Sequence, residues 1–309
     1  MSRRLRFVLI VCALLFVAFE AASAWMFGHL GANLTVRAET KDAIHLATTP
    51  LTPNTVLIVG NSLVLHGIDL DALNATLGPS YVARKETVVG SGYQDWLYGV
   101  PSLLDRGSHP TLIVLGFSPA QLVMDRPPIA RTTRLVWTAH NLERYTVDRR
   151  IGLTAASNLV LQHFSAFFAL RDQLRQDSRK LIVPGYAAMS HDFFDGAPLS
   201  PDPADVAIAA ARLVQLDSMC AAHGARFAYL LMPTRAVDDA ALEPMMIEAG
   251  KRAGVPVLVP IPNSALPVED QLDGYHLNAA GAAMFSARTG AALRAISEVS
   301  TPGVVSPGS

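Results

Sequence analysis

The chain has 309 residues, of which 50% are hydrophobic and 17% are charged, and its formal net charge is −1. This size and apolar content are enough to bury the core of one α/β domain. The near-neutral charge and the lack of a Lys/Arg-rich stretch argue against a nucleic-acid partner, because a phosphate backbone is bound by a basic surface. The two cysteines, Cys12 and Cys220, are too few for a disulfide framework or a cysteine metal site. We expect no cofactor and no bound metal ion.

The N-terminal segment, residues 1–27, predicts export from the cytoplasm. Three arginines come first: Arg3, Arg4 and Arg6. They precede an uninterrupted apolar run over residues 7–19, as the positive-inside rule requires. The segment is either an uncleaved anchor of roughly 20 residues or a signal peptide removed near the small residues 22–24. The remaining chain is then extracytoplasmic, anchored on the periplasmic side of the inner membrane or secreted. A third reading, a buried helix of a cytosolic protein, leaves the arginines unexplained.

Residues 28–54 are predicted to be a tether, because they are mixed in character and contain two prolines near their end.

Five short β-rich runs follow: 55–59, 81–89, 111–115, 226–231 and 255–259. Helix-like stretches separate or follow them, most clearly 203–223 and 279–296. Apolar strands that alternate with helices are typical of a parallel sheet buried on both faces. The predicted fold of residues 55–298 is therefore a three-layer α/β/α sandwich with a mainly parallel, flavodoxin-like sheet. Residues 299–309 are predicted to be a disordered tail.

The stretch 124–201 interrupts this alternation. It contains an amphipathic helix predicted over residues 157–176 and a turn-rich piece over residues 191–203. A single crossover between two strands does not need so long a chain. We therefore interpret it as an insertion that covers one end of the sheet, as a lid or as a surface for a partner.

A serine follows the first strand, in the sequence Gly60-Asn61-Ser62. In an open α/β sheet, ligands bind at the carboxyl ends of the strands. A glycine there permits a sharp turn, and a serine on that turn can lie at the N-terminus of the next helix, where backbone N–H groups face an anion. Alone, the tripeptide favours a simpler interpretation, in which Ser62 caps a helix that begins near Leu63.

A second polar sequence, Asp273-Gly274-Tyr275-His276, lies between the last strand and the last helix. An Asp and a His three residues apart on a loop can meet through the imidazole Nδ1–H, which leaves Nε2 as the base for a hydroxyl. Alone, such a loop is more often an ordinary polar turn. Together with a serine at the end of the first strand, it completes a set of nucleophile, base and orienting group: Ser62, His276 and Asp273.

These residues resemble sequence blocks of the SGNH (GDSL-type) hydrolases and their acyltransferase relatives. The first block holds Asn61 where the family usually has aspartate, and the last block corresponds to residues 273–276. The second block, whose glycine supplies a backbone N–H to the oxyanion hole, corresponds to residues 90–92, with Gly92 the best match. The third block normally reads Gly-x-Asn-Asp, but this chain has Ser118 where the asparagine should be.

The resemblance implies a serine-dependent esterase or O-acyltransferase that acts on acylated cell-envelope carbohydrate through an acyl-enzyme. Ser62, Asp273 and His276 would be catalytic. The N–H groups of Ser62 and Gly92, with the side chain of Ser118, would hold the oxyanion. The altered third block resembles that of membrane-tethered envelope relatives that move or remove acyl groups on polysaccharides. It also leaves an alternative open, a non-catalytic SGNH-like component that binds or assembles envelope polysaccharide, with an envelope protein as a partner.

Two further residues are candidates for substrate binding, Asn61 and Arg235. Arg235 follows the fourth strand, where it either holds an anionic sugar or pairs with Asp238 or Asp239. The glycines at 90 and 92 are a poor dinucleotide signature, because Asp95 stands where the third glycine belongs.

Histidines elsewhere in the chain are weaker candidates for functional residues. His191, Asp192 and Asp195 lie in a Gly/Pro-rich stretch, where such side chains are more often solvated than bound to a metal. His163 lies among phenylalanines and is predicted to pack on a helix face.

Overall fold

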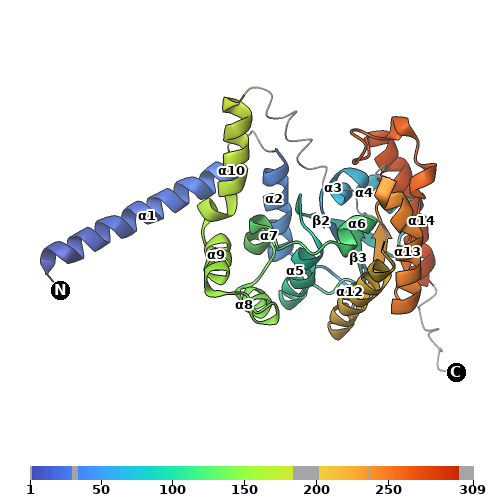
Figure 1. Ribbon diagram of the computed structural model, residues 1–309, viewed down its shortest axis with the longest axis horizontal. Helices are drawn as coiled ribbons and strands as arrows, with labels where there is room; N and C mark the ends of the chain where they lie inside the picture. The colour runs from blue at the N-terminus through green and yellow to red at the C-terminus, as the bar shows by residue number, and fades with distance from the viewer. Residues whose placement is uncertain (1, 30–33, 184–201, 235–236, 299–309) are drawn as a thin grey trace. The chain divides into compact units, whose positions relative to one another are not determined.

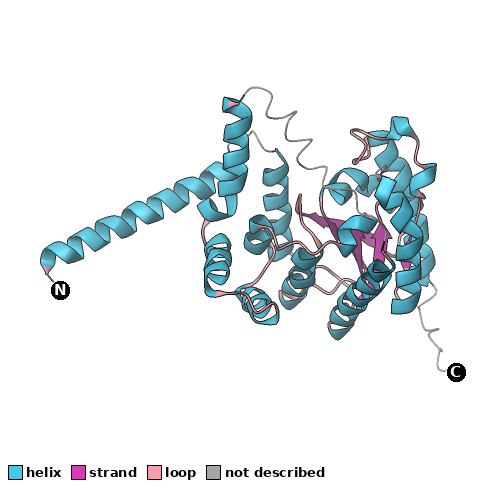
Figure 2. Ribbon diagram, in the orientation of Figure 1, coloured by secondary structure: helices cyan, strands magenta, loops and turns pink. Residues whose placement is uncertain are grey.

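The computed structural model describes residues 2–29, 34–183, 202–234 and 237–298. The chain divides into two compact units. The α/β unit consists of Leu51–Tyr93, Gly107–Arg126 and Leu199–Ser309, and the helical unit of Met1–Pro50, Gln94–Arg106 and Pro127–Pro198. All strands in the described part of the chain belong to the α/β unit (Figure 2).

The α/β unit is built on five parallel strands. They are β1 (Thr55–Gly60), β2 (Val82–Thr87), β3 (Leu112–Phe117), β4 (Arg226–Leu231) and β5 (Val257–Leu258). Their order in the sheet is β2-β1-β3-β4-β5, and every pair is parallel. This is the flavodoxin-like sheet predicted from the alternation of strands and helices.

The strand ends differ from the sequence prediction in detail. β3 extends to Phe117, two residues past the predicted run, and β5 has two residues where five were predicted. Pro256 explains the short β5, because proline has no N–H to donate to a ladder. Its carbonyl still accepts the N–H of Tyr229 in β4.

Helices cover both faces of this sheet. One face is covered by α3 (Ser62–Gly67), α4 (Leu70–Leu77) and α14 (Ala279–Glu298), and the other by α12 (Pro203–Ala222) and α13 (Val237–Ala253). Val56 and Ile58 of β1 pack into one core with Leu73 of α4 and Phe285 of α14. Alternate strand residues point to the opposite face, where α12 packs on β4 and on α13. The fold of this unit is the predicted three-layer α/β/α sandwich.

The described part of the helical unit contains seven helices (Figure 1). They are α1 (Arg3–His29), α2 (Leu34–Thr48), α5 (Tyr93–Asp105), α7 (Ala130–Leu135), α8 (Ala139–Asp148), α9 (Leu153–Phe164) and α10 (Ala166–Ile182). α5 connects β2 to β3 in sequence, and α7 to α10 come from the stretch interpreted as an insertion. Glu39 of α2 is buried and pairs with Arg131 of α7 through Oε2 and Nε at 3.1 Å.

Two sequence predictions for this unit are corrected. The tether predicted over residues 28–54 contains helix α2, which packs on α1 and α7. Residues 157–176 do not form one helix, because α9 ends and α10 begins at Ser165, with a bend of 101° between them. Ser165 explains the break, since its Oγ accepts the N–H of Phe168 and caps α10.

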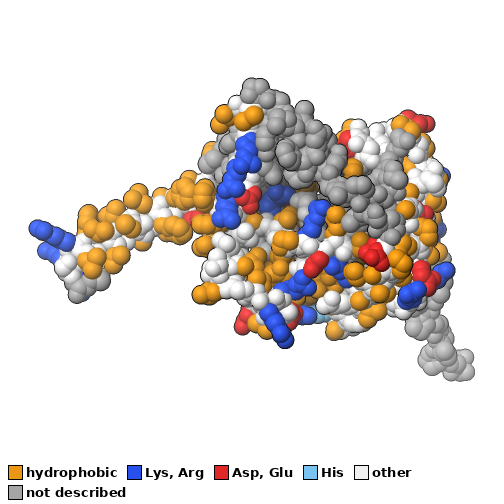
Figure 3. Space-filling model, viewed as in Figure 1, with side chains coloured by type: hydrophobic (Ala, Val, Ile, Leu, Met, Phe, Trp, Pro, Cys, Tyr) orange, Lys and Arg blue, Asp and Glu red, His pale blue; other side chains and the backbone are white. Residues whose placement is uncertain are grey.

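Helix α1 is the one described helix that is long and apolar enough on its own to cross a membrane, with a mean hydropathy of 2.5 over Arg3–Trp25. A signal sequence would pass the same test. Figure 3 shows hydrophobic side chains along its exposed length and arginines at its N-terminal tip. The N-terminal prediction therefore holds for a helix that is long and apolar enough to span a membrane or to be a signal sequence.

Candidate active site

Ser62 lies at the junction of β1 and α3. β1 ends at Gly60, and Asn61 is the N-cap of α3, with its Oδ1 accepting the N–H of Leu63 at 3.0 Å. The cap is therefore Asn61, which corrects the interpretation of Ser62 as the cap and leaves the serine hydroxyl for other contacts. Only glycine fits at position 60, because a Cβ there would lie 2.6 Å from the carbonyl oxygen of Gly116.

His276 is held by a short turn that closes on itself. Asp273 Oδ1 accepts the backbone N–H groups of Tyr275 at 3.0 Å and His276 at 2.8 Å. Gly274 between them has φ +81°, a left-handed conformation that favours glycine. The turn thus places the imidazole beside its own aspartate, as the spacing of the two residues predicts.

The three side chains form a continuous hydrogen-bonded chain. His276 Nδ1 donates to Asp273 Oδ2 at 2.8 Å, and Ser62 Oγ donates to His276 Nε2 at 2.9 Å. Ser62 and His276 are 214 residues apart in sequence. The structure therefore brings together the serine, histidine and aspartate that the sequence analysis selected.

The charge state of Asp273 sets the direction of these hydrogen bonds. Partial burial acts to raise the pKa of Asp273, but its hydrogen bonds with the side chain of His276 and with the N–H groups of His276 and Tyr275 outweigh burial and lower the pKa. An ionised carboxylate can only accept, so Nδ1 carries a proton, and in the neutral imidazole Nε2 then accepts from Ser62. The imidazole is in the tautomer that a general base needs.

His66 lies beside this chain and was not selected from the sequence. It follows Ser62 by one turn of α3, and its ring meets that of His276 edge-on, with centroids 5.1 Å apart. Partial burial, followed by the proximity of His276, lowers the pKa of His66. A neutral ring at this position packs against His276 without opposing a positive charge on it.

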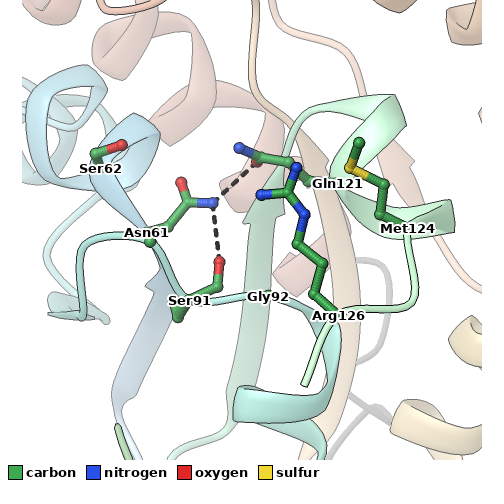
Figure 4. Close-up of a pocket in the computed structure, with 8 residues that line it drawn as sticks. Asn61, Ser62, Ser91, Gly92, Gln121, Met124 and Arg126 are labelled. Atoms are coloured by element: carbon green, nitrogen blue, oxygen red, sulfur yellow. Dashed lines mark hydrogen bonds between the residues drawn. The ribbon is translucent and has the colours of Figure 1, made fainter. Parts of the chain in front are cut away.

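A pocket of about 60 Å³ opens beside Ser62 (Figure 4). Its lining comes from the segments that follow three neighbouring strands: Asn61 and Ser62 after β1; Gly90, Ser91 and Gly92 after β2; Gln121, Met124 and Arg126 after β3. β1 lies between β2 and β3, so the strand order reverses its direction across the sheet at β1. In open parallel sheets, ligands bind at the point where the strand order reverses. Of the predicted site residues, Asn61, Ser62 and Gly92 line the pocket.

Asn61 is engaged by the protein at both ends of its amide. Its Nδ2 donates to the carbonyl of Ser91 at 3.2 Å and to Oε1 of Gln121 at 3.0 Å. Both amide protons are thereby used, so a substrate could reach this side chain only through Oδ1. Its predicted role in substrate binding stays a prediction.

Ser118 does not face the pocket. It is 1% exposed and is the N-cap of α6 (Pro119–Val123), with Gln121 at the third helical position of a capping box. Gln121, not Ser118, lines the pocket. The sequence Ser118-x-x-Gln121 matches a capping box, the pattern that marks the start of a helix. This pattern is the sequence signal that indicates Gln121.

Several candidates lie outside the described residues, namely Arg235, His191, Asp192 and Asp195. Asp239 is described, and its carboxylate accepts the N–H of Ala120 and the hydroxyl of Thr234. His163 packs edge-on against Phe164, as predicted for a helix face. The described residues contain no group of three His, Cys, Asp or Glu side chains that could hold a metal ion.

No protein-family model matches this chain, and no curated protein matches it. One solved structure is similar, the crystal structure of LAE5, an alpha/beta hydrolase enzyme from the metagenome of Lake Arreo, Spain. The similarity covers 79% of this chain and 97% of that one, with 12% sequence identity and a TM-score of 0.42.

Proposed function

We propose that this chain is a serine-dependent esterase or O-acyltransferase of the SGNH type. The observation that carries the proposal is the hydrogen-bonded chain from Ser62 Oγ through His276 to Asp273, with both bonds at 2.8 to 2.9 Å. Nucleophile, base and orienting group must meet in this way for a serine to attack a carbonyl. The position of Ser62 beside a pocket at the carboxyl edge of the sheet supports the same role.

The proposed reaction uses these three side chains in turn. Ser62 Oγ attacks the carbonyl carbon of an acyl ester while its proton passes to His276 Nε2. Asp273 stabilises the imidazolium that forms. His276 then gives the proton to the leaving alcohol oxygen as the ester C–O bond breaks, and the acyl group remains on Ser62. Water or a sugar hydroxyl repeats the steps in reverse, which releases an acid or a new ester.

The size of the pocket favours a short acyl group. Its volume of about 60 Å³ is well below the roughly 150 Å³ of a cavity that holds benzene. An acetyl group is of the right size, whereas a long acyl chain would have to lie outside the pocket. We therefore expect acetyl esters to be hydrolysed faster than octanoyl esters.

Helix α1 supports an extracytoplasmic site of action. Its Glu20 accepts the N–H of Ala166 at 2.8 Å, and Phe19 packs on Phe167 with ring centroids 5.0 Å apart. Cleavage near residues 22–24 would remove these contacts, so they favour an uncleaved anchor over a removed signal peptide. Together with the resemblance to the SGNH sequence blocks, this location makes acylated carbohydrate at the outer side of the membrane the proposed substrate. A reporter that works only outside the cytoplasm, fused after Ser309, should be active, and activity of a cytoplasm-only reporter there would contradict this location.

The test uses the full-length chain in detergent with a fluorophosphonate probe. We expect the probe to label Ser62, and we expect Ser62→Ala to abolish both labelling and hydrolysis of acetyl esters. Ser80→Ala is the control, since Ser80 is an exposed serine near the opposite edge of the sheet, before β2 begins. A folded wild-type chain that is neither labelled nor hydrolytic would refute the enzyme and favour the polysaccharide-binding alternative.

A further inference from the structure

The orientation of two side-chain amides in the pocket is determined by backbone groups. The N–H of Leu63 can only donate, so the Asn61 atom that it meets is Oδ1. The other amide atom of Asn61 is therefore Nδ2, which donates to the carbonyl of Ser91 and to Gln121. The atom of Gln121 that receives this bond is Oε1.

A second backbone donor fixes the same oxygen of Gln121. The N–H of Ser118 donates to Gln121 Oε1 at 3.2 Å. With its oxygen accepting from Ser118 and Asn61, Gln121 directs Nε2 away from both of them. Figure 4 shows this nitrogen pointing to the side of the pocket where Ser62 lies. Within the described residues, no hydrogen-bond acceptor is found for Gln121 Nε2.

The helix that carries Gln121 is held at both ends. At its start, Asp239 Oδ1 accepts the N–H of Ala120 at 2.9 Å. At its end, Arg212 Nη1 donates to the carbonyls of Leu122 at 2.6 Å and Met124 at 2.8 Å. The donor protons of Gln121 are thus preorganised before any substrate arrives, as electrostatic catalysis requires.

We propose that Gln121 Nε2 is the side-chain donor of the oxyanion hole, in place of both the family asparagine and the predicted Ser118. This inference rests on the proposed function, because the oxyanion exists only if Ser62 attacks a carbonyl. As negative charge develops on the carbonyl oxygen, a proton of Nε2 donates to it, alongside the backbone N–H groups predicted at Ser62 and Gly92. No bond to Gln121 forms or breaks.

The sharpest variant is Gln121→Glu, which keeps an oxygen for the N–H groups of Ser118 and Asn61 but replaces the donor with an acceptor. We expect kcat and kcat/KM for acetyl-ester hydrolysis to fall together by about 10²–10³-fold, the usual cost of one oxyanion donor. KM should be nearly unchanged, because the lost interaction is made only in the transition state. A carboxylic acid can donate, so the ratio of variant to wild-type activity should rise as the pH is lowered from about 8 to about 5.

Two further variants complete the test. Gln121→Met has similar size but can neither donate nor accept strongly, and it should show the same loss without the pH-dependent recovery. Gln215→Glu is the matched control, because Gln215 Oε1 also accepts a hydrogen bond, from Tyr93, in the same unit but outside the pocket. Thermal unfolding of each variant separates a loss of fold from a loss of the donor.

These experiments distinguish a failure of the role proposed for Gln121 from a failure of the proposed function. If Ser62→Ala abolishes labelling while both Gln121 variants hydrolyse like wild type, the role of Gln121 is overturned and the esterase stands. If the wild-type chain is neither labelled nor hydrolytic, the proposed function is overturned together with this inference.

A different observation carries a second inference, about the helical unit. Helix α9 has no Asp, Glu, Lys or Arg, and four of its large apolar side chains are exposed. They are Leu153, Val160, Leu161 and Phe164. Their spacing puts them on one face of the helix, and Phe164 is 66% exposed. Contiguous exposed apolar patches on a protein surface mark contacts with a membrane, a ligand or another protein.

The contact with α1 indicates that a membrane covers it. Glu20 of α1 binds the N-terminus of α10, at the bend that follows α9. Glu20 lies five residues before Trp25, the end of the apolar span, which is about 7.5 Å along a helix. Amphipathic helices in a bilayer surface are buried by about 5–10 Å. Figure 1 shows α9 running across the direction of α1, as a helix lying in the membrane surface would.

We propose that this stripe of α9 lies in the outer surface of the bilayer that α1 spans. The test uses the full-length chain in phosphatidylcholine vesicles, with Cys12→Ser, and with an environment-sensitive fluorophore attached to a cysteine introduced by Phe164→Cys or Leu153→Cys. Lipids with nitroxide on the acyl chain should quench both probes more strongly than the control probe, because a helix at the boundary of headgroups and acyl chains lies close to the nitroxide. Val147→Cys is the control, because Val147 is 68% exposed on α8 of the same unit. Equal, weak quenching at all three positions would overturn the proposal.

Discussion

Two groups of residues near Ser62 are specified in different ways. In the first group, His276 and Asp273 meet through a four-residue turn, and each hydrogen bond between them is local. In the second group, Gln121 is oriented by Asn61, which is 60 residues away in sequence, and by the N–H of Ser118. A local turn can be recognised by residue spacing alone. A donor placed by a long-range network cannot, and the residue at the expected alignment position, Ser118, is buried instead.

The largest effect should come from the first group. His276→Gln removes the proposed base for the proton of Ser62, and loss of such a base in a serine hydrolase costs about 10⁶ in kcat. We expect acetyl-ester hydrolysis to become barely measurable and fluorophosphonate labelling of Ser62 to become very slow. Labelling at the wild-type rate would show that Ser62 is activated by something other than His276.

Asp273→Asn should have the next largest effect. An amide can donate to Nδ1, which favours the wrong tautomer and leaves Nε2 protonated, and the cost of such a change is about 10⁴ in kcat. Steady-state kinetics should show little change in KM. Asp71→Asn is a suitable control, because Asp71 is described in the first turn of α4, away from the pocket lining. A loss of tenfold or less would mean that Asp273 only shapes the turn.

In the second group, the variant Ser118→Ala should have a small effect on catalysis. Loss of an N-cap hydroxyl destabilises a protein by about 1 kcal/mol, whereas loss of an oxyanion donor costs about 10²-fold or more in rate. We expect a modest fall in the unfolding midpoint and a rate close to wild type. A 100-fold fall in kcat with normal stability would return the oxyanion role to Ser118 and contradict the assignment to Gln121.

The smallest effect concerns stability as a function of pH. The pKa of Asp273 in the folded chain lies below its ordinary value of 3.8, so the unfolded chain binds the proton more readily. The carboxylate therefore stabilises the fold at any pH above its ordinary pKa, and this contribution is lost as the pH falls through the lowered pKa. Asp273→Asn should lower the unfolding midpoint relative to wild type at neutral pH. Denaturant titrations should show the difference shrinking below about pH 4, and a difference independent of pH would contradict the sign of the shift.

Much of the fold could be predicted because its signals are local. The apolar run of β1, Thr55–Gly60, and the capped helix α12, Pro203–Ala222, each follow from patterns within one segment. The bend at Ser165 was missed because the apolar pattern of α9 and α10 continues across it. The hydroxyl of Ser165 caps α10. From the sequence alone, this serine cannot be distinguished from a serine on the surface of a continuous helix.

The sequence by itself determined the parallel sheet, the apolar N-terminal helix and the turn that joins Asp273 to His276, because strand burial, hydropathy and hydrogen bonds across three residues are set by neighbours in the chain. Only the tertiary structure decided that His276 Nε2 reaches Ser62, and that Gln121 rather than Ser118 lines the pocket. Both depend on where the segments after separate strands converge at one edge of the sheet. That convergence is set by strand order and helix packing over the whole unit, which no short segment of sequence encodes.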